Sequence, residues 1–343
     1  MKKVISLLMS FVMLLSVTAG VDLSAYAANA TSGKCGNNVY WSYDKGSETL
    51  TISGTGAMNN YDNYDNVPWR GYRENIMTVK IETGVTTIGE RAFHGCSSLT
   101  SVTIPNSVTT IEDYAFWDCD SLTSVTIPNG VTTIEDLAFW NCESLTSVTI
   151  PNSVTTIGNE AFYGCESLTS VTIGNSVKTI GRSAFNRCIS LTSIDVASGN
   201  LNYSSKDGAL FDKNKSTLIQ YPIGNKRTEY TIPNSVTTIG ERAFKDCSSL
   251  TSVTIPNSVK TIEWGAFKFC SSLTSVTIPN SVTTIGNNAF CGCESLTSVT
   301  IGNSVTTIGE FAFFYCISLT SVTIPNSVKT IEWGAFKFCS SLT

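Results

Sequence analysis

The sequence predicts a solenoid of stacked units, each about 23 residues long, with a parallel sheet on one face and short helical turns, in the class α/β or mainly β. Ten Ala-Phe pairs support this prediction, because successive phenylalanines lie 23 residues apart except across one gap. A cysteine follows each phenylalanine at the third position, and a strand pattern precedes each pair. One such unit is too short to bury its own apolar residues, so the units must stack into a common core.

The period is regular in both its phenylalanines and its cysteines. The phenylalanines are Phe93, Phe116, Phe139, Phe162, Phe185, Phe244, Phe267, Phe290, Phe313 and Phe336, and the cysteines are Cys96, Cys119, Cys142, Cys165, Cys188, Cys247, Cys270, Cys293, Cys316 and Cys339. The irregular gap, from Phe185 to Phe244, spans 59 residues, one period of 23 plus 36. Thr251 to Thr274 recurs identically at Thr320 to Thr343, which indicates duplication of a three-repeat block.

Each unit contains a strand, a turn and a second buried stretch. The alternation of Val102 and Ile104 with hydroxyl residues predicts a short strand. A Pro-Asn pair then ends it, because proline cannot donate to the ladder and asparagine favours turns. Ala115, Phe116 and Cys119 have the spacing i, i+1, i+4, which is typical of the inner side of a short helical turn.

The recurring SLTSVTIPNSVTTIG and Ala-Phe-x-x-Cys segments resemble the BspA-like family of bacterial surface leucine-rich repeats from about Val79 to the end of the chain. The resemblance implies a leucine-rich-repeat solenoid, curved and with a parallel sheet on one face. It also implies attachment to host or matrix components and to other bacteria. The repeats depart from the commoner leucine-rich consensus, which places Asn or Cys directly after the strand.

The N-terminus has the pattern of a secretory signal over residues 1–27. Lys2 and Lys3 precede an uncharged, mostly apolar stretch, and Ala25-Tyr26-Ala27 supplies a small-x-small cleavage site. The sequence therefore predicts a secreted or cell-surface protein without membrane insertion after cleavage. An uncleaved anchor is the alternative, because about 18 apolar residues can just span a bilayer.

Two further segments lie outside the regular repeats. Residues 28–78 are predicted to form an N-terminal β cap with a hairpin around the turn at Asp44-Lys45-Gly46, and residues 79–343 form the solenoid. The insertion at 194–230 is predicted to be a hairpin that protrudes at Asp207-Gly208. Five cations concentrate in it: Lys206, Lys213, Lys215, Lys226 and Arg227. They form a candidate site for an anionic polymer or an acidic host surface, with ordinary solvated loop charge as the alternative.

Composition argues against several functions. The formal net charge is -5 and no basic run is present, so we expect no nucleic acid partner. A Ser-His-Asp triad would have to use His94, the one histidine, and no glycine-rich phosphate loop occurs. We therefore expect no enzyme activity, no cofactor and no metal site.

The cysteines divide into two groups. Ten of the twelve share one repeat position, where side chains that point inward in parallel have poor geometry for disulfides. We interpret these ten as buried thiols that act as small apolar residues. Cys35 and Cys291 stand outside the series and are the better candidates for a disulfide or a reactive thiol.

The position directly after the repeat phenylalanine is a candidate binding site. His94, Trp117, Trp140 and Tyr163 occupy it in four successive units, so their rings are predicted to form a row on one flank. Such rows suit sugars or protein hot spots, and packing onto the stack is the alternative. Columns of outward Ser and Thr offer a second polar surface. The sequence thus predicts a binding or adhesion module for a protein or glycan, with a passive structural spacer as the alternative.

Overall fold

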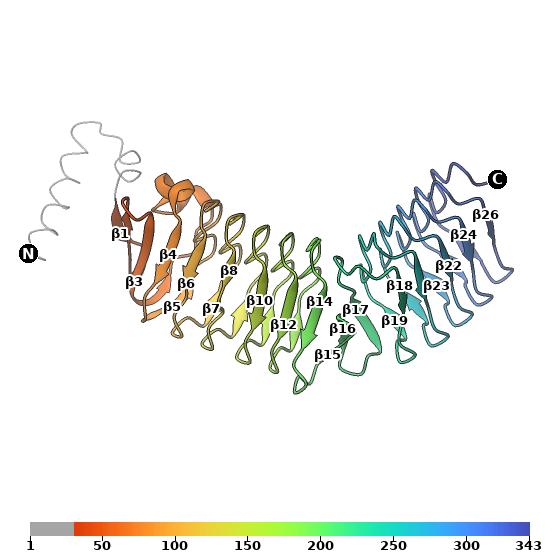
Figure 1. Cartoon of the computed structure of the whole chain (residues 1–343), viewed down its shortest axis with the longest axis horizontal. Helices are drawn as coiled ribbons and strands as arrows, with labels where there is room; N and C mark the ends of the chain where they lie inside the picture. The colour runs from red at the N-terminus through yellow and green to blue at the C-terminus, as the bar shows by residue number, and fades with distance from the viewer. Residues whose placement is uncertain (1–30) are drawn as a thin grey trace, which may run out of the picture.

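The computed structural model describes residues 31–343, and the signal predicted at 1–27 lies outside the described residues. The chain forms a curved solenoid in which each repeat makes one turn, here called a rung, and the stacked rungs build an arch (Figure 1). The predicted solenoid fold is confirmed. The described part is mainly β, since its helices are two short 3-10 helices, η1 (Tyr64–Asn66) and η2 (Arg70–Asn75).

Parallel strands line two sides of the stack rather than one. The first column has two parts on either side of the insertion. They are β4 (Thr78–Ile81), β6 (Ser101–Thr103), β8 (Ser124–Val125), β10 (Ser147–Ile150), β12 (Ser170–Ile173) and β14 (Ser193–Val196), then β18 (Glu229–Thr231), β20 (Ser252–Thr254), β22 (Ser275–Thr277), β24 (Ser298–Thr300) and β26 (Ser321–Thr323). The pairing follows the period, because Ser147 faces Ser170 and Val148 faces Val171.

The second column holds the Thr-Ile pairs of each rung. Its strands are β5 (Val85–Ile88), β7 (Thr110–Ile111), β9 (Thr133–Ile134), β11 (Thr156–Ile157) and β13 (Thr179–Ile180), then β17 (Thr217–Gln220), β19 (Thr238–Ile239), β21 (Thr261–Ile262), β23 (Thr284–Ile285), β25 (Thr307–Ile308) and β27 (Thr330–Ile331). Each Thr-Ile pair aligns with the same pair 23 residues on, as Thr156 does with Thr179. Sequence periodicity thus becomes strand register on both sides.

The core consists of ladders of identical residues. In one complete rung the buried set is Leu122, Val125, Ile127, Val131, Ile134, Ala138, Phe139 and Cys142. The Phe139 ring is fully buried and stacks on Phe116 and Phe162, with ring centroids 5.1 and 5.2 Å apart. Each large apolar side chain buried in this way stabilises the fold by roughly 1.5–3 kcal/mol. Within this continuous core, each rung is therefore stabilised mainly by the two rungs next to it.

A hairpin covers the first rung. Strands β2 (Gly36–Asp44) and β3 (Thr49–Met58) are antiparallel, as the sequence predicted, and β1 (Ser32–Lys34) adds to β2. Strand β3 pairs in parallel with both β4 and β5, so one long strand begins both columns. Gly54 and Gly56 have φ values of 109° and 102°, which let β3 bend from one side to the other.

The insertion lies inside the stack, so the prediction that it protrudes is wrong. Strands β15 (Tyr203–Lys206) and β16 (Ala209–Asp212) form the predicted hairpin, but β16 also pairs with β17, which joins the second column. Leu210 packs into the core on the N-terminal side, whereas Ala209 and Phe211 pack into the core on the C-terminal side. Because both faces of β16 are buried, the insertion joins the two halves of the arch (Figure 1).

Candidate functional site

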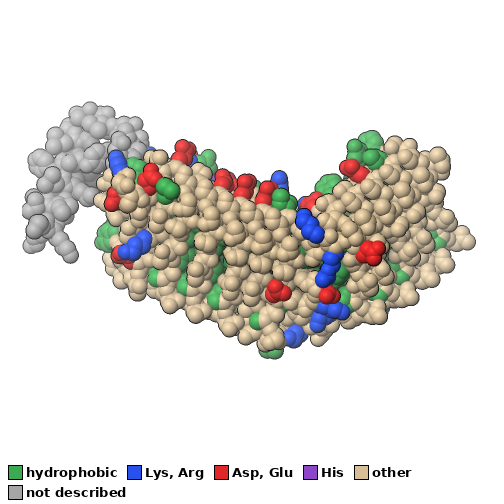
Figure 2. Space-filling model, in the orientation of Figure 1, with side chains coloured by type: hydrophobic (Ala, Val, Ile, Leu, Met, Phe, Trp, Pro, Cys, Tyr) green, Lys and Arg blue, Asp and Glu red, His purple; other side chains and the backbone are tan. Residues whose placement is uncertain are grey.

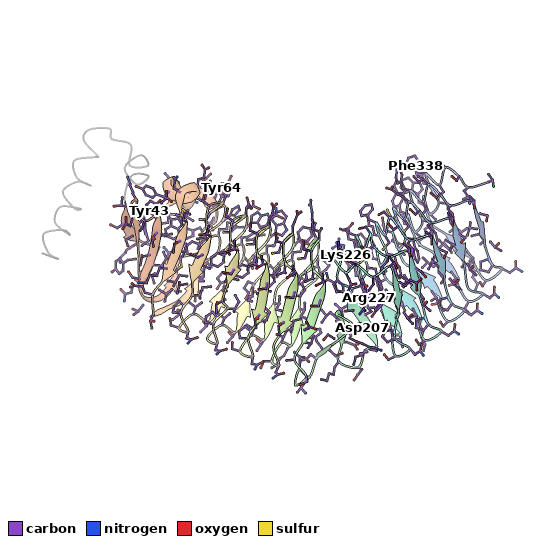
Figure 3. The ribbon with its side chains drawn as sticks, viewed as in Figure 1. Tyr43, Tyr64, Asp207, Lys226, Arg227 and Phe338 are labelled. Atoms are coloured by element: carbon purple, nitrogen blue, oxygen red, sulfur yellow. The ribbon has the colours of Figure 1, made fainter. Side chains whose placement is uncertain are left out.

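The variable residues of the repeats gather on the concave edge of the arch. They are the residues two and three positions before, and one and two positions after, each repeat phenylalanine; together they are called the rim. Figure 3 labels a residue at each end of this edge: Tyr64 at the N-terminal end and Phe338, in the last repeat, at the other. In each repeat, the Ala-Phe pair lies between the rim residues that precede it and those that follow it. Both side chains of the pair are buried in the core, as Ala115 and Phe116 are.

The rim backbone is built from consecutive turns, in place of the short helical turn expected from the spacing. The residues two before and two after the phenylalanine have positive φ, for example Tyr114 at 58° and Asp118 at 53°. Left-handed backbone costs a residue other than glycine about 1–2 kcal/mol. Hydrogen bonds to the next rung hold it in place, since the N–H groups of Tyr114, Phe116 and Asp118 donate to Asp136, Ala138 and Trp140 at 3.1, 2.8 and 2.9 Å. This ladder fixes the backbone while its outward side chains vary.

The predicted aromatic row is present in the structure. Ring centroids are 5.6 Å apart between His94 and Trp117, 4.2 Å between Trp117 and Trp140, and 5.7 Å between Trp140 and Tyr163, all stacked. Tyr64 extends the row, with its ring 4.9 Å from His94. All four predicted rings are half-buried, so each packs on its neighbours and keeps part of its surface in solvent.

The surroundings of His94 disfavour the charged form of its imidazole. Burial lowers the pKa of its imidazole, and its Nδ1 atom is buried without a hydrogen-bond partner. The ring therefore contributes a stacking surface, and its environment gives no support to a role in acid-base chemistry.

Carboxylates flank the row in the N-terminal half. The pKa values of Glu112 and Glu135 are both raised. Burial is the larger cause, and the neighbouring acidic residues are the smaller one. Asp113 accepts a hydrogen bond from the Asp136 N–H at 2.8 Å, and Asp136 accepts one from the Asn159 N–H at 2.6 Å. Figure 2 shows acidic side chains along this stretch of the concave edge. The N-terminal half of the rim thus combines stacked rings with negative charge.

The C-terminal half of the rim has aromatic residues that were not predicted. Phe269, Tyr315, Trp333 and Phe338 are 43%, 45%, 65% and 56% exposed. A hollow of about 420 Å³ lies among Phe269, Tyr315 and their neighbours. The sequence contains the signal for these rings, because three of the four occupy the second position after the repeat phenylalanine, next to the position of the predicted row.

The five basic residues of the insertion do not form one cluster. Lys226 and Arg227 lie beside Asp207 over the boundary between the two halves (Figure 3), where the Arg227 guanidinium donates to the Asp207 carbonyl at 3.4 Å. Lys206 is in the strand that precedes Asp207 and is exposed. Lys213 and Lys215 belong instead to the turn between β16 and β17, where the Lys213 ammonium donates to the Asn200 carbonyl.

All twelve cysteines are free and buried. Each ladder thiol after the first rung of a half donates to the phenylalanine carbonyl of the preceding rung, as Cys142 does to Phe116 at 3.2 Å. Cys35 and Cys291, the better candidates for a disulfide or a reactive thiol, are also free and buried. Burial raises the pKa of Cys35 to about 12 and raises that of Cys291, which disfavours the nucleophilic thiolate.

Two negative findings apply to residues 31–343. This part of the chain brings together no group of three His, Cys, Asp or Glu side chains suited to a metal ion. It also contains no helix that is long and apolar enough to cross a bilayer.

The family model and the similar solved structures all describe leucine-rich repeat proteins. Residues 72–192, 132–222 and 223–343 match the model of the BspA type leucine rich repeat region, in six copies. The chain is similar to a leucine-rich repeat protein from Eubacterium ventriosum, at 30% identity and TM-score 0.74, over 91% of this chain and 95% of that one. A leucine rich cell surface protein from Faecalibacterium prausnitzii is 28% identical with TM-score 0.67, over 92% and 94%. A leucine-rich repeat protein from Bacteroides ovatus is 26% identical with TM-score 0.57, over 89% and 92%. No curated protein matches the chain.

Proposed function

Because the chain belongs to the BspA type leucine-rich repeat family, we propose that it is a secreted or cell-surface binding module that recognises a protein or glycan through its rim. The module binds its partner without catalysing a reaction and serves adhesion. The surface location is supported by the signal pattern at 1–27 and by the cell-surface description of the similar Faecalibacterium protein.

The contrast between a repeated scaffold and a varied rim carries this proposal. Buried positions hold the same Leu, Val, Ile, Ala, Phe and Cys in almost every rung. The position after the phenylalanine instead holds His, Trp, Tyr, Asn, Lys, Cys or Phe in different rungs. Packing explains the constant set, whereas rim variation serves no packing requirement common to all rungs. A surface that varies on a rigid scaffold is what selective recognition requires.

The chemistry of the rim suits a binding surface. Trp117, Trp140 and Tyr163 stack in one row and are partly exposed, and aromatic residues dominate the energy of protein interfaces. The exposed rings around Phe269 and Tyr315 form a second apolar area on the same edge. Residues 28–78, whose strand β3 begins both columns, act in this proposal as a cap that protects the first rung.

The experiment is a binding screen of the full chain against an array of matrix proteins and glycans. We expect saturable binding to at least one member, and weaker binding by a Trp117→Ala, Trp140→Ala double variant that keeps its thermal midpoint. Saturable binding to no member of the array would favour the passive spacer and contradict the proposal.

A further inference from the structure

A hollow of about 260 Å³ opens in the rim where the two halves of the arch meet. Its aromatic wall comes from both halves, with Trp140 and Tyr163 from the N-terminal side and Trp264 from the C-terminal side. The cations Arg242, Lys245 and Lys268 line its C-terminal wall. Here it is called the junction pocket.

The insertion creates this pocket. In the insertion rung Tyr221 takes the place of the ladder phenylalanine, since its N–H donates to Ala243 at 2.7 Å and its ring stacks on Phe244. The next residue, Pro222, is buried, so this rung places no exposed side chain at the position where most other rungs place a ring or a lysine. The preceding rung has the shorter, buried Asn186 at that position. The row of rings therefore stops here and leaves a hollow at the bend of the arch.

The cationic wall is held in place by contacts across the junction and with aromatic rings, and within residues 31–343 one of its three cations forms no ion pair. The Arg242 guanidinium donates to Ser183 Oγ across the junction at 2.7 Å and lies 4.4 Å from the Trp264 ring centre. Its Nε atom is buried without a hydrogen-bond partner. The Lys268 ammonium lies over the Trp264 and Phe269 rings, and in residues 31–343 it forms no ion pair. Lys245 pairs with Asp246 at 2.8 Å, and the Arg242 guanidinium lies 3.8 Å from the Glu241 carboxylate, so Lys268 is the pocket cation without an ion pair in the described residues.

Size and residue type together indicate the ligand class. The pocket is below the roughly 300–1,000 Å³ of small-molecule sites, so it suits one anchoring side chain of a larger partner. Trp, Tyr and Arg are the residues most enriched at the hot spots of protein interfaces. The Glu160 carboxylate, in the N-terminal wall, disfavours an anion placed beside it but can accept hydrogen bonds from the backbone N–H groups of a peptide.

We infer that the junction pocket is the anchor site for an acidic segment of a protein partner, with an Asp or Glu carboxylate held by Arg242 and Lys268 against the aromatic wall. This inference rests on the proposed function and assigns the partner class to the rim. Charge-assisted hydrogen bonds from Arg and Lys supply the selectivity for a carboxylate over an amide.

The test measures binding of the full chain to immobilised 12-residue peptides rich in Asp and Glu, and to counterparts in which every acid is replaced by its amide. We expect acidic peptides to bind at least about tenfold more tightly, as the gain of one charge-assisted hydrogen bond requires. Lys268→Gln should remove this preference. Lys260→Gln is the matched control, because Lys260 is an exposed lysine of the same repeat outside the pocket lining.

Equal binding of acidic and amide peptides overturns the inference, as does an unchanged preference in Lys268→Gln. Hyaluronan and chondroitin sulfate form a further arm, and preferential binding of these polymers through Lys268 would replace the acidic peptide by an acidic glycan. That outcome leaves the proposed function intact. Absence of saturable binding to the peptides, the polymers and the matrix-protein array would contradict both proposals.

Discussion

Replacing one ladder phenylalanine in the middle of the stack should cost far more stability than replacing one in the last described rung. Phe139 is 0% exposed and its ring lies between two parallel neighbours at 5.1 and 5.2 Å. Truncation of a fully buried phenylalanine to alanine costs about 3–5 kcal/mol. Phe336 is the matched control, because it occupies the same repeat position but is half-buried and stacks only on Phe313 at 5.3 Å. We expect Phe336→Ala to lose less than half as much.

The assay combines urea unfolding with amide hydrogen exchange. A solenoid unfolds in parts, so a single transition can conceal a local loss. Hydrogen exchange should show reduced protection in the rungs around Phe139, which contain Phe116 and Phe162, while rungs beyond the insertion keep theirs. Equal losses in Phe139→Ala and Phe336→Ala, or loss of protection along the whole chain, would refute the idea that rungs are stabilised by their neighbours.

Three further predictions concern the cap, the acidic flank and the thiols. Trp69→Phe should cost about 1–3 kcal/mol in urea unfolding, because it leaves the buried Ala92 carbonyl without the indole N–H that donates to it at 3.0 Å. Burial, and to a smaller extent Asp113 and Asp136, raises the pKa of Glu135. The charged form of Glu135 therefore destabilises the fold at neutral pH, and this destabilisation disappears as the pH falls through the raised pKa. Glu135→Gln should therefore raise Tm at pH 7 and give a smaller gain near pH 4; an equal gain at both values would contradict this reasoning. Iodoacetamide at pH 7 should leave Cys96 unmodified in the folded chain, because burial raises its pKa to about 12; rapid native labelling seen by mass spectrometry would show otherwise.

The periodic part of the fold could be predicted from the sequence because stacking turns a 23-residue period directly into strand register. The aromatic row followed in the same way, since residues at one repeat position must lie in one column. The exposed rings Phe269 and Tyr315 could not be predicted from the period in this way. They stand at a left-handed backbone position, where glycine and asparagine are expected and bulky rings are rare.

The insertion shows a second limit of periodic patterns. Asp207-Gly208 and the strand-like runs after it correctly predicted a hairpin, but the prediction that the hairpin protrudes from the stack was wrong. The uninterrupted run Ala209, Leu210 and Phe211 was the better indicator, because a strand buried on both faces lacks apolar-polar alternation. The junction pocket could not be predicted, since it brings together side chains from rungs on both sides of the bend.

The most direct test of recognition through the rim compares two double variants in one binding assay, against the tightest ligand of the protein and glycan array. One variant, Trp117→Ala with Trp140→Ala, alters the rim, and the other, Thr126→Ala with Thr149→Ala, alters the exposed hydroxyl side of the first column. We expect the rim variant to raise Kd at least about 30-fold, as loss of a hot-spot residue worth about 2 kcal/mol or more requires, and the hydroxyl variant to bind like the unaltered chain. Loss of binding in the hydroxyl variant alone would contradict recognition through the rim.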